Sequence, residues 1–202
     1  MRQPNESRPM PTCNDTADLT NLTEPAYLII GSPQPIRSGD TTCTLDLGEG
    51  IQRSIPIAEA EAAHWLRTPR TQHIARTHLH HLGHHNNFLT RHEYNGTLTR
   101  ILPTRRSIQF TQPDLWLQLT ATPITGPYPG ITALVHHTGR TYAFLPTALL
   151  PVFTQPHGTT LDDAIRAAHH ATGLPTNTLT RNTLQALPQL LAGDYLIATN
   201  RA

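Results

Sequence analysis

The sequence predicts an α+β fold made of two tandem winged-helix-like units, each with a three-stranded antiparallel sheet and three helices. Three observations lead to this prediction. Short runs of alternating apolar and polar residues are separated by Gly- and Pro-containing turns, apolar residues at helical spacing follow each set of runs, and the same order of elements occurs twice. We expect the units at residues 26–103 and 104–202, after a disordered tail over residues 1–25 that lacks apolar periodicity.

The first unit begins with strands and continues with helices. Thr71 is placed as the N-cap of the second helix, and Gly83 as the residue that ends it. The turn signal formed by Asn95 and Gly96 leads into the last strand. In order, the expected elements are strands at 27–30, 42–47 and 52–57, helices at 58–66, 71–82 and 87–92, and a strand at 97–102.

The second unit repeats this order after a polar joint at 103–112. Thr160 is expected to cap a helix that ends at Gly173, and the third helix, which starts near Asn177, contains Pro188. The expected strands lie at 115–120, 131–136, 141–145 and 195–198, and the first helix lies at 147–153. The repeat rests on the order and spacing of apolar residues rather than on residue identity.

The composition excludes several classes of protein. All 15 basic residues are Arg, so the chain cannot supply the phosphate-binding Lys of a P-loop or a Schiff-base Lys, and it contains no G-x-G-x-x-G string. The formal net charge is only +1, which argues against a nucleic-acid partner. Two Cys residues and the lack of an apolar signal or spanning segment favour a cytoplasmic protein with no membrane partner.

No stretch spells a catalytic site. Neither Ser nor Cys lies in a G-x-S-x-G elbow, and the segment 158–174, which has the outline of a Nudix helix, lacks the Glu pair that binds magnesium. His80 with His84, and His81 with His85, have the spacing of zinc ligands on one helix face, but no Cys or carboxylate stands beside them. We therefore predict no cofactor and keep these His pairs only as candidate metal ligands.

Several stretches carry a family resemblance. The first half reads T-L-D-L-G-E-G-I-Q-R-S-I-P-I-A-E-A-E-A-A-H-W-L and later F-L-T-R-H-E-Y-N-G-T-L-T-R-I-L, and the second reads R-T-Y-A-F-L-P-T-A-L-L, T-T-L-D-D-A-I and L-P-Q-L-L-A-G-D-Y-L-I-A. These stretches resemble the PqqD-like winged-helix domain. It is also called the RiPP recognition element, because it binds the leader peptides of ribosomally made, post-translationally modified peptides. The resemblance covers nearly all of residues 26–199.

The resemblance implies a mode of binding. In that family the peptide adds as an extra strand to the edge of the sheet, and its side chains dock between the third strand and the third helix. By position, the peptide-binding residues would be Arg53, Ile55, Ile57, Phe88, Arg91 and Tyr94 in the first half, and Tyr142, Phe144, Arg181 and Leu184 in the second.

Two considerations qualify these candidates. Pro56 lies in the first edge strand and removes a backbone donor, which counts against the first site and favours the second. Core packing is the alternative role for Ile55, Ile57, Phe88 and Phe144, because apolar side chains are most often buried.

The expected function is non-catalytic. We predict a peptide-recognition protein that binds a precursor (leader) peptide by strand addition and presents it to a separate modifying enzyme in natural-product biosynthesis. A homodimer would cover the exposed sheet edge when no peptide is bound. Two alternatives stay open: a winged-helix DNA-binding transcriptional regulator, and an enzyme whose site forms between the units from Arg140, His137 and Asp162.

Overall fold

The first half of the chain contains two separate sheets. The computed structural model describes residues 16–47, 50–84, 87–104, 108–112 and 114–200. One sheet has the order β5-β1-β6-β7 and contains β1 (Ala26–Ile29), β5 (Arg70–Thr71), β6 (Leu98–Pro103) and β7 (Ile108–Phe110). The other has the order β2-β3-β4 and contains β2 (Ser32–Pro33), β3 (Thr42–Asp46) and β4 (Gln52–Pro56). The helices are the 3-10 turn η2 (Ile57–Glu59), α1 (Ala60–Trp65), α2 (Gln72–His81) and α3 (Asn87–Tyr94).

The second half also contains two separate sheets, one of two strands and one of three. β8 (Leu115–Leu119) pairs antiparallel with β12 (Leu196–Asn200), as β1 pairs with β6. A three-stranded antiparallel sheet contains β9 (Thr122–Thr125), β10 (Ile131–Val135) and β11 (Tyr142–Pro146). The helices are the 3-10 turn η3 (Thr147–Leu149), α4 (Leu150–Phe153), α5 (Leu161–Thr172) and α6 (Thr176–Ala192). The described chain is therefore an α+β protein with six α-helices and several small antiparallel sheets.

The two halves share one local motif closely. β4 and β11 show the same alternation of exposed and buried residues, and each ends in a proline, Pro56 or Pro146. Each proline is followed directly by a 3-10 turn and a short helix. Proline fixes φ near −65° and has no N–H, so it is well suited to the point where a strand ends and a helix starts. The last residue of each 3-10 turn is buried, but it is Glu59 in one half and Leu149 in the other.

The strand pairing differs from the sequence prediction. The first strand of each half was expected to join the second and third strands in one sheet, whereas it pairs with the last strand of that half. The three-stranded sheets are completed instead by β2 and β9, which lie in segments expected to be turns. In the first half the chain changes direction at Gly31, where φ is +88°. Glycine adopts this conformation readily because it has no Cβ.

Two segments that were expected to be a tail or a joint are ordered parts of the body. Ala17 and Leu19, which fall within the expected tail, are buried, and the Ala17 N–H donates to the Pro69 carbonyl at 2.8 Å. β7 lies in the expected joint at 103–112 and pairs with β6. In both segments the few apolar residues stand among polar ones and show no helical or strand periodicity, so the sequence did not predict their burial.

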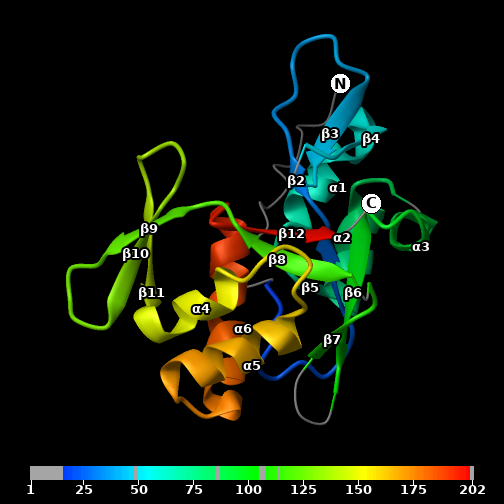
Figure 1. The fold of residues 1–202 in the computed structure, drawn as a ribbon. Helices are drawn as coiled ribbons and strands as arrows, with labels where there is room; N and C mark the ends of the chain where they lie inside the picture. Colours follow the sequence, from blue (N-terminus) through cyan, green and yellow to red (C-terminus); the bar gives the residue numbers. More distant parts are fainter. Residues whose placement is uncertain (1–15, 48–49, 85–86, 105–107, 113, 201–202) are drawn as a thin grey trace, which may run out of the picture.

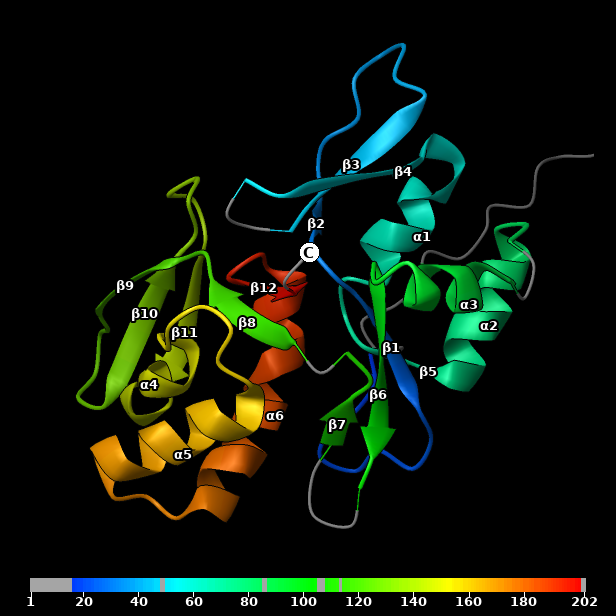
Figure 2. The ribbon, with the colours of Figure 1, turned by 45° about the vertical axis from the view of Figure 1, so that its right-hand side comes forward.

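Contacts between the halves join them into one body. Buried apolar side chains from both halves form a single cluster. The Gly31 N–H donates to the Ala198 carbonyl of β12 at 2.7 Å, the Thr199 hydroxyl donates to the Leu47 carbonyl, and Arg67 forms an ion pair with Asp194. Figures 1 and 2 show β8 and β12 at the centre, with the β9–β10–β11 sheet on one side and the β1–β6 pair on the other.

Candidate functional site

The β9–β10–β11 sheet has an open edge at β11. This strand pairs with β10 on one side and, within the described part of the chain, has no strand on the other. Figure 1 shows the sheet at the periphery, with α4 beside one end. An open edge presents backbone N–H and C=O groups that another strand can pair with.

Two backbone hydrogen bonds between β10 and β11 fix which residues of β11 present these groups. The Thr147 N–H donates to the Gly130 carbonyl at 2.8 Å, and the His136 N–H donates to the Thr141 carbonyl at 3.1 Å. Along a strand of an antiparallel pair, the backbone N–H and C=O groups of successive residues alternately bond to the partner strand and point away from it. Given the register of β10 with β11, Tyr142 and Phe144 therefore direct both their N–H and their C=O groups toward the open edge.

The opposite edge of the same sheet offers fewer donors. The Gly126 N–H donates to the Ile131 carbonyl at 3.1 Å, and this bond with the β9–β10 register places Pro123 among the outward-facing residues of β9. Proline has no N–H, so a central donor is missing at this edge. Pro146 also faces outward, but at the end of β11. The β9 edge therefore offers fewer backbone donors to an added strand than the β11 edge does.

An apolar face accompanies the open edge. Tyr142 is 56% exposed and Phe144 is 62% exposed, and both lie on the same side of β11. Phe144 and Ile124, which is 47% exposed, flank Ala133 in register across the three strands. Tyr128, in the turn after β9, is 72% exposed. Four of the six exposed large hydrophobic side chains of the described residues therefore lie on this one sheet and its turn.

A hollow lies along the β9–β10 turn next to this face. Its volume is about 740 Å³. Gly126 allows the tight turn, because a Cβ at this position would lie 2.5 Å from the Ile131 carbonyl oxygen. The lining is contributed by the turn, the flanking strands and the start of α4, and it includes Ile124, Pro127, Tyr128, Pro129, Ile131 and Leu150.

Sequence reasoning identified only part of this face. Tyr142 and Phe144 were named, whereas Ile124 and Tyr128 were assigned to a turn. The run Thr122–Thr125 alternates weakly and contains a proline, which obscured the strand. The flanking sequence Gly126-Pro-Tyr-Pro-Gly130 is a strong turn signal, and read as a hairpin turn it would have indicated β9.

The corresponding edge in the first half is polar. The Ile57 N–H donates to the Thr41 carbonyl at 3.1 Å, which fixes the alternation along β4. The backbone groups that face outward from β4 therefore belong to Gln52, Ser54 and Pro56. Pro56 therefore removes no bond to β3, and Pro146 stands at the same place in β11. The proline does not distinguish the two edges, contrary to our sequence argument. What distinguishes them is the pair Tyr142 and Phe144.

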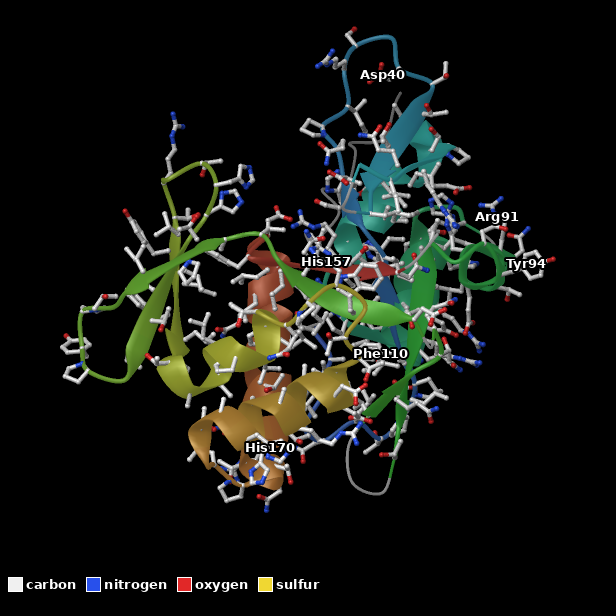
Figure 3. All side chains as sticks on the ribbon, viewed as in Figure 1. Asp40, Arg91, Tyr94, Phe110, His157 and His170 are labelled. Atoms are coloured by element: carbon white, nitrogen blue, oxygen red, sulfur yellow. The ribbon has the colours of Figure 1, made fainter. Side chains whose placement is uncertain are left out.

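The other candidates of the first half have structural contacts. Ile55 and Phe88 are buried in the core, as the alternative reading proposed, and Ile57 is half-buried. Arg53 donates to the backbone carbonyl of Asn95 at the end of α3. Tyr94 is 90% exposed, and Figure 3 shows it extending from the outer side of α3. These residues are therefore divided between the core, a contact with the end of α3 and the exposed side of α3.

Arg91 belongs to a network around Glu59. The Arg91 guanidinium pairs with Glu59 Oε1, and Glu59 Oε2 lies 2.7 Å from His92 Nε2. His92 Nδ1 lies 2.7 Å from the Thr97 hydroxyl oxygen, and Glu59, His92 and Thr97 are all buried. Burial lowers the pKa of His92 despite its bond to Glu59. This chain of bonds resembles a catalytic triad in its order, but the hydroxyl is enclosed, so its evident role is to join η2 to α3.

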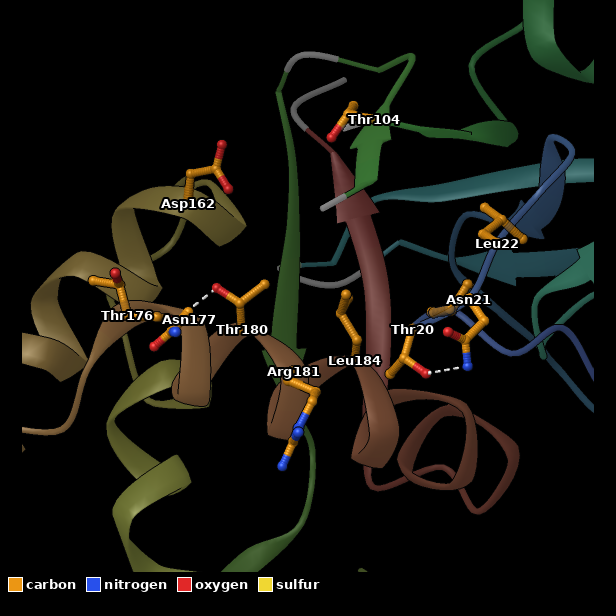
Figure 4. Close-up of a pocket in the computed structure, with 11 residues that line it drawn as sticks. Thr20, Asn21, Leu22, Thr104, Asp162, Thr176, Asn177, Thr180, Arg181 and Leu184 are labelled. Carbon is orange, nitrogen blue, oxygen red and sulfur yellow. Dashed lines mark hydrogen bonds between the residues drawn. The ribbon is translucent and has the colours of Figure 1, made fainter. Parts of the chain in front are cut away.

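The predicted groove of the second half is divided between two places. Arg181 and Leu184 line a cavity of about 620 Å³ between the start of α6 and residues 19–22, whereas Tyr142 and Phe144 are not among its described lining residues. α6 contacts β12 and η3, so its apolar side is used for the core. Figure 4 shows Asp162 and Arg181, which both line this cavity, extending in different directions.

His80 and His84 do not share a helix face. α2 ends at His81, and Gly83 follows with φ +80°. The His84 ring lies beside Phe88, with ring centroids 5.1 Å apart, and His85 lies outside the described residues. In the described ranges, no three His, Cys, Asp or Glu side chains gather closely enough to hold a metal ion.

The residues of the alternative enzyme site lie in different elements. His137 and Arg140 are in the turn between β10 and β11, whereas Asp162 lies in the first turn of α5 and lines the cavity beside α6.

None of the helices in the described ranges is long and apolar enough to span a bilayer. Comparison of the chain with protein-family models, with curated proteins and with solved structures finds no match.

Proposed function

We propose that the protein is a non-catalytic peptide-recognition protein that captures a peptide by strand addition at β11. The observation that carries this proposal is that Tyr142 and Phe144 combine outward-facing backbone groups with exposed aromatic side chains on one edge strand. Backbone bonds then supply affinity for any extended peptide, and the aromatic side chains supply a preference for apolar residues at alternate positions.

The size of the apolar face suits a short peptide. A fully buried aromatic side chain removes about 150–250 Å² from water, and Tyr142 and Phe144 are each little more than half exposed. Together with Ile124 and Tyr128, they provide a face of the size that monomers commonly use for binding, about 300–600 Å². A stable protein–protein interface usually needs about 800 Å² on each partner.

The resemblance to the RiPP recognition element supports a leader peptide as the ligand and a separate modifying enzyme as the second partner. In this proposal each half is a winged-helix-like unit, and the second half holds the peptide while the first half supports it through the shared core. Arg181 and Leu184 are not assigned to the peptide, because they line the cavity beside α6. DNA binding is less well supported, since Arg140 is the only Arg between Arg106 and Arg166 and phosphate contacts usually need a cluster of basic residues.

The test is a selection of 12-residue peptides from a random display library on the purified protein, followed by fluorescence-polarisation titration of the enriched peptides. Phe144→Pro removes an outward N–H and the aromatic ring but no bond to β10, whereas Phe144→Leu keeps the N–H. We expect the first change to weaken binding at least tenfold and the second by less. Ser54→Pro, at the outward-facing position of β4 that corresponds to Phe144, is the matched control and should leave binding unchanged.

Backbone measurements give an independent check. The Tyr142 and Phe144 amides should exchange slowly with solvent only when peptide is bound, because strand addition would enclose them. Urea midpoints equal to that of the unchanged protein would show that the variants are folded. Peptides that bind equally well to Phe144→Pro, or a promoter duplex that binds while no peptide is enriched, would reject the proposal.

A further inference from the structure

We propose that the captured peptide is acidic at one end of its paired segment, where a carboxylate side chain meets Arg140. This inference rests on the proposed function and adds the chemistry of the ligand to it. The expected pattern is apolar, any, apolar, any, acidic, read from the amino end of a peptide that runs antiparallel to β11.

The charges around the edge support an acidic ligand. No Asp or Glu occurs between Asp114 and Asp162, and Arg140 is the one residue with a formal charge in that interval. All of β9, β10 and β11 therefore lie in a region that has no negative side chain of its own. His136 and His137, whose ring centroids are 3.9 Å apart, lie in the same turn as Arg140. A carboxylate at this place would meet no repulsion from this sheet.

Among the described residues, Arg140 has no competing partner. It is exposed, and no hydrogen bond or ion pair of its side chain is found within the described ranges. The acidic residues of the second half that form ion pairs have other partners, as in Asp163 with Arg166 on α5 and Asp194 with Arg67. Guanidinium groups bind carboxylates through two parallel hydrogen bonds. Arg140 is thus a free recognition group at the end of the open edge.

The register gives the spacing of the pattern. Tyr142 and Phe144 face outward, so the peptide residues paired with them lie on the same face and contact their rings. Arg140 is two residues before Tyr142, in the turn directly before β11. In an antiparallel peptide that extends past Tyr142, the residue nearest Arg140 comes about two positions after the one opposite Tyr142. The two apolar residues are therefore followed by the acidic one at the same spacing.

Charge also favours a peptide over a second copy of the chain. A second copy that paired its β11 with this edge would bring the same interval, which has no Asp or Glu, to Arg140. Both arginines would then remain without a carboxylate, and the paired face would be smaller than stable dimers need. A peptide with a carboxylate satisfies the charge and matches the small area.

The experiment is a comparison of peptide selections on three proteins: the unchanged chain, Arg140→Glu, and Arg37→Glu as a matched control at another exposed Arg. We expect an acidic residue to be enriched four positions after the first apolar residue for the unchanged chain and for the control. For Arg140→Glu we expect Lys or Arg at that position. Replacement of the acidic residue by Gln in an enriched peptide should weaken binding about fivefold to the unchanged chain, and not at all to Arg140→Gln.

The outcomes separate the two proposals. Enriched peptides that depend on Phe144 but show no acidic preference would overturn this inference and leave the proposed function standing. Enriched peptides that do not depend on Phe144 would overturn both. Sedimentation velocity of the unchanged chain and of Phe144→Pro, without peptide, tests whether a second copy of the chain occupies the edge. A dimer that Phe144→Pro converts to monomer would show that a second copy covers the edge. This result would also overturn the inference.

Discussion

Glu59 and His92 form a buried pair, with Glu59 Oε2 2.7 Å from His92 Nε2. The corresponding residue in the second half, at the end of η3, is Leu149, which is buried in the core. The strand, proline and 3-10 turn that the two halves share are therefore held to the core by a polar network in one half and by apolar packing in the other. This difference suggests a direct measurement of what the network contributes to stability.

Glu59→Leu should destabilise the protein, because it leaves the His92 ring nitrogen without its partner in the core. We expect a loss of about 1–3 kcal/mol in the free energy of unfolding, measured by urea denaturation. Glu59→Leu with His92→Leu should be more stable than Glu59→Leu alone, since no buried nitrogen is then unpaired, and the Thr97 hydroxyl keeps its bond to the backbone carbonyl of residue 92. Glu61→Leu, at an exposed position of α1, is the control. A fully stable Glu59→Leu protein would show that the network contributes nothing.

The pH dependence of stability should also report on His92. Burial lowers the pKa of His92 below its ordinary value, so the unfolded chain takes up this proton at a higher pH than the folded protein does. The contribution is complete above the unfolded pKa of about 6.5 and is lost as the pH falls. Burial likewise lowers the pKa of His64. We expect a lower free energy of unfolding at pH 5.5 than at pH 7.5.

A His92→Gln variant tests this assignment. Its stability should depend less on pH than that of the unchanged protein, so the difference between the two should shrink on acidification. The matched control is His170→Gln, because His170 is exposed on α5 (Figure 3). A pH dependence that is identical in the His92 variant and the unchanged protein would contradict the prediction.

The N-cap of α5 gives a smaller and cleaner effect. The Thr160 hydroxyl accepts a bond from the Asp163 N–H, whereas the Thr71 side chain at the start of α2 makes no such bond. Thr160→Ala should therefore cost about 1 kcal/mol in the free energy of unfolding, and Thr71→Ala should cost less. Equal losses in the two variants would indicate that the hydroxyl bond is not what stabilises α5.

Gly31 should not tolerate a side chain. Its φ is +88°, and a Cβ at this position would lie 2.6 Å from Leu47 Cδ2 and 2.8 Å from the Asp46 carbonyl oxygen. Gly31→Ala should lower the free energy of unfolding by at least about 2 kcal/mol. Gly39→Ala has a similar φ of +96° but no atom within 4 Å of the added Cβ, so its loss should be limited to the backbone strain. Calorimetric midpoints of both variants would separate strain from crowding.

Local signals in the sequence were sufficient for the helices. α5 begins after Thr160 and ends before Gly173, which has φ +73°, as the cap residues predicted. α2 and α3 also occur where the apolar spacing and Gly83 placed them. In these elements the residues that decide the structure lie within a few positions of one another.

Pairing between distant strands could not be read in the same way. β1 is an apolar run that fits a sheet in either arrangement, and its pairing with β6 depends on residues about seventy positions later. The burial of Glu59 was also hidden, because its partner His92 belongs to another element. For the site, Tyr142 and Phe144 were named from resemblance, and their exposure agrees with a surface role rather than with the core alternative for Phe144. Their part in binding remains a prediction.

The bond from Gly31 to Ala198 bears on the order in which the protein folds. Gly31 emerges early from the ribosome, but the carbonyl that accepts its N–H belongs to β12, as does the partner strand of β8. The first half can form its helices and the β1–β6 pair while synthesis continues, yet its apolar surface facing β12 stays uncovered until about residue 200 has been released. This nascent state exposes a hydrophobic face and is the stage at which the chain is most open to chaperones, proteases and misassembly.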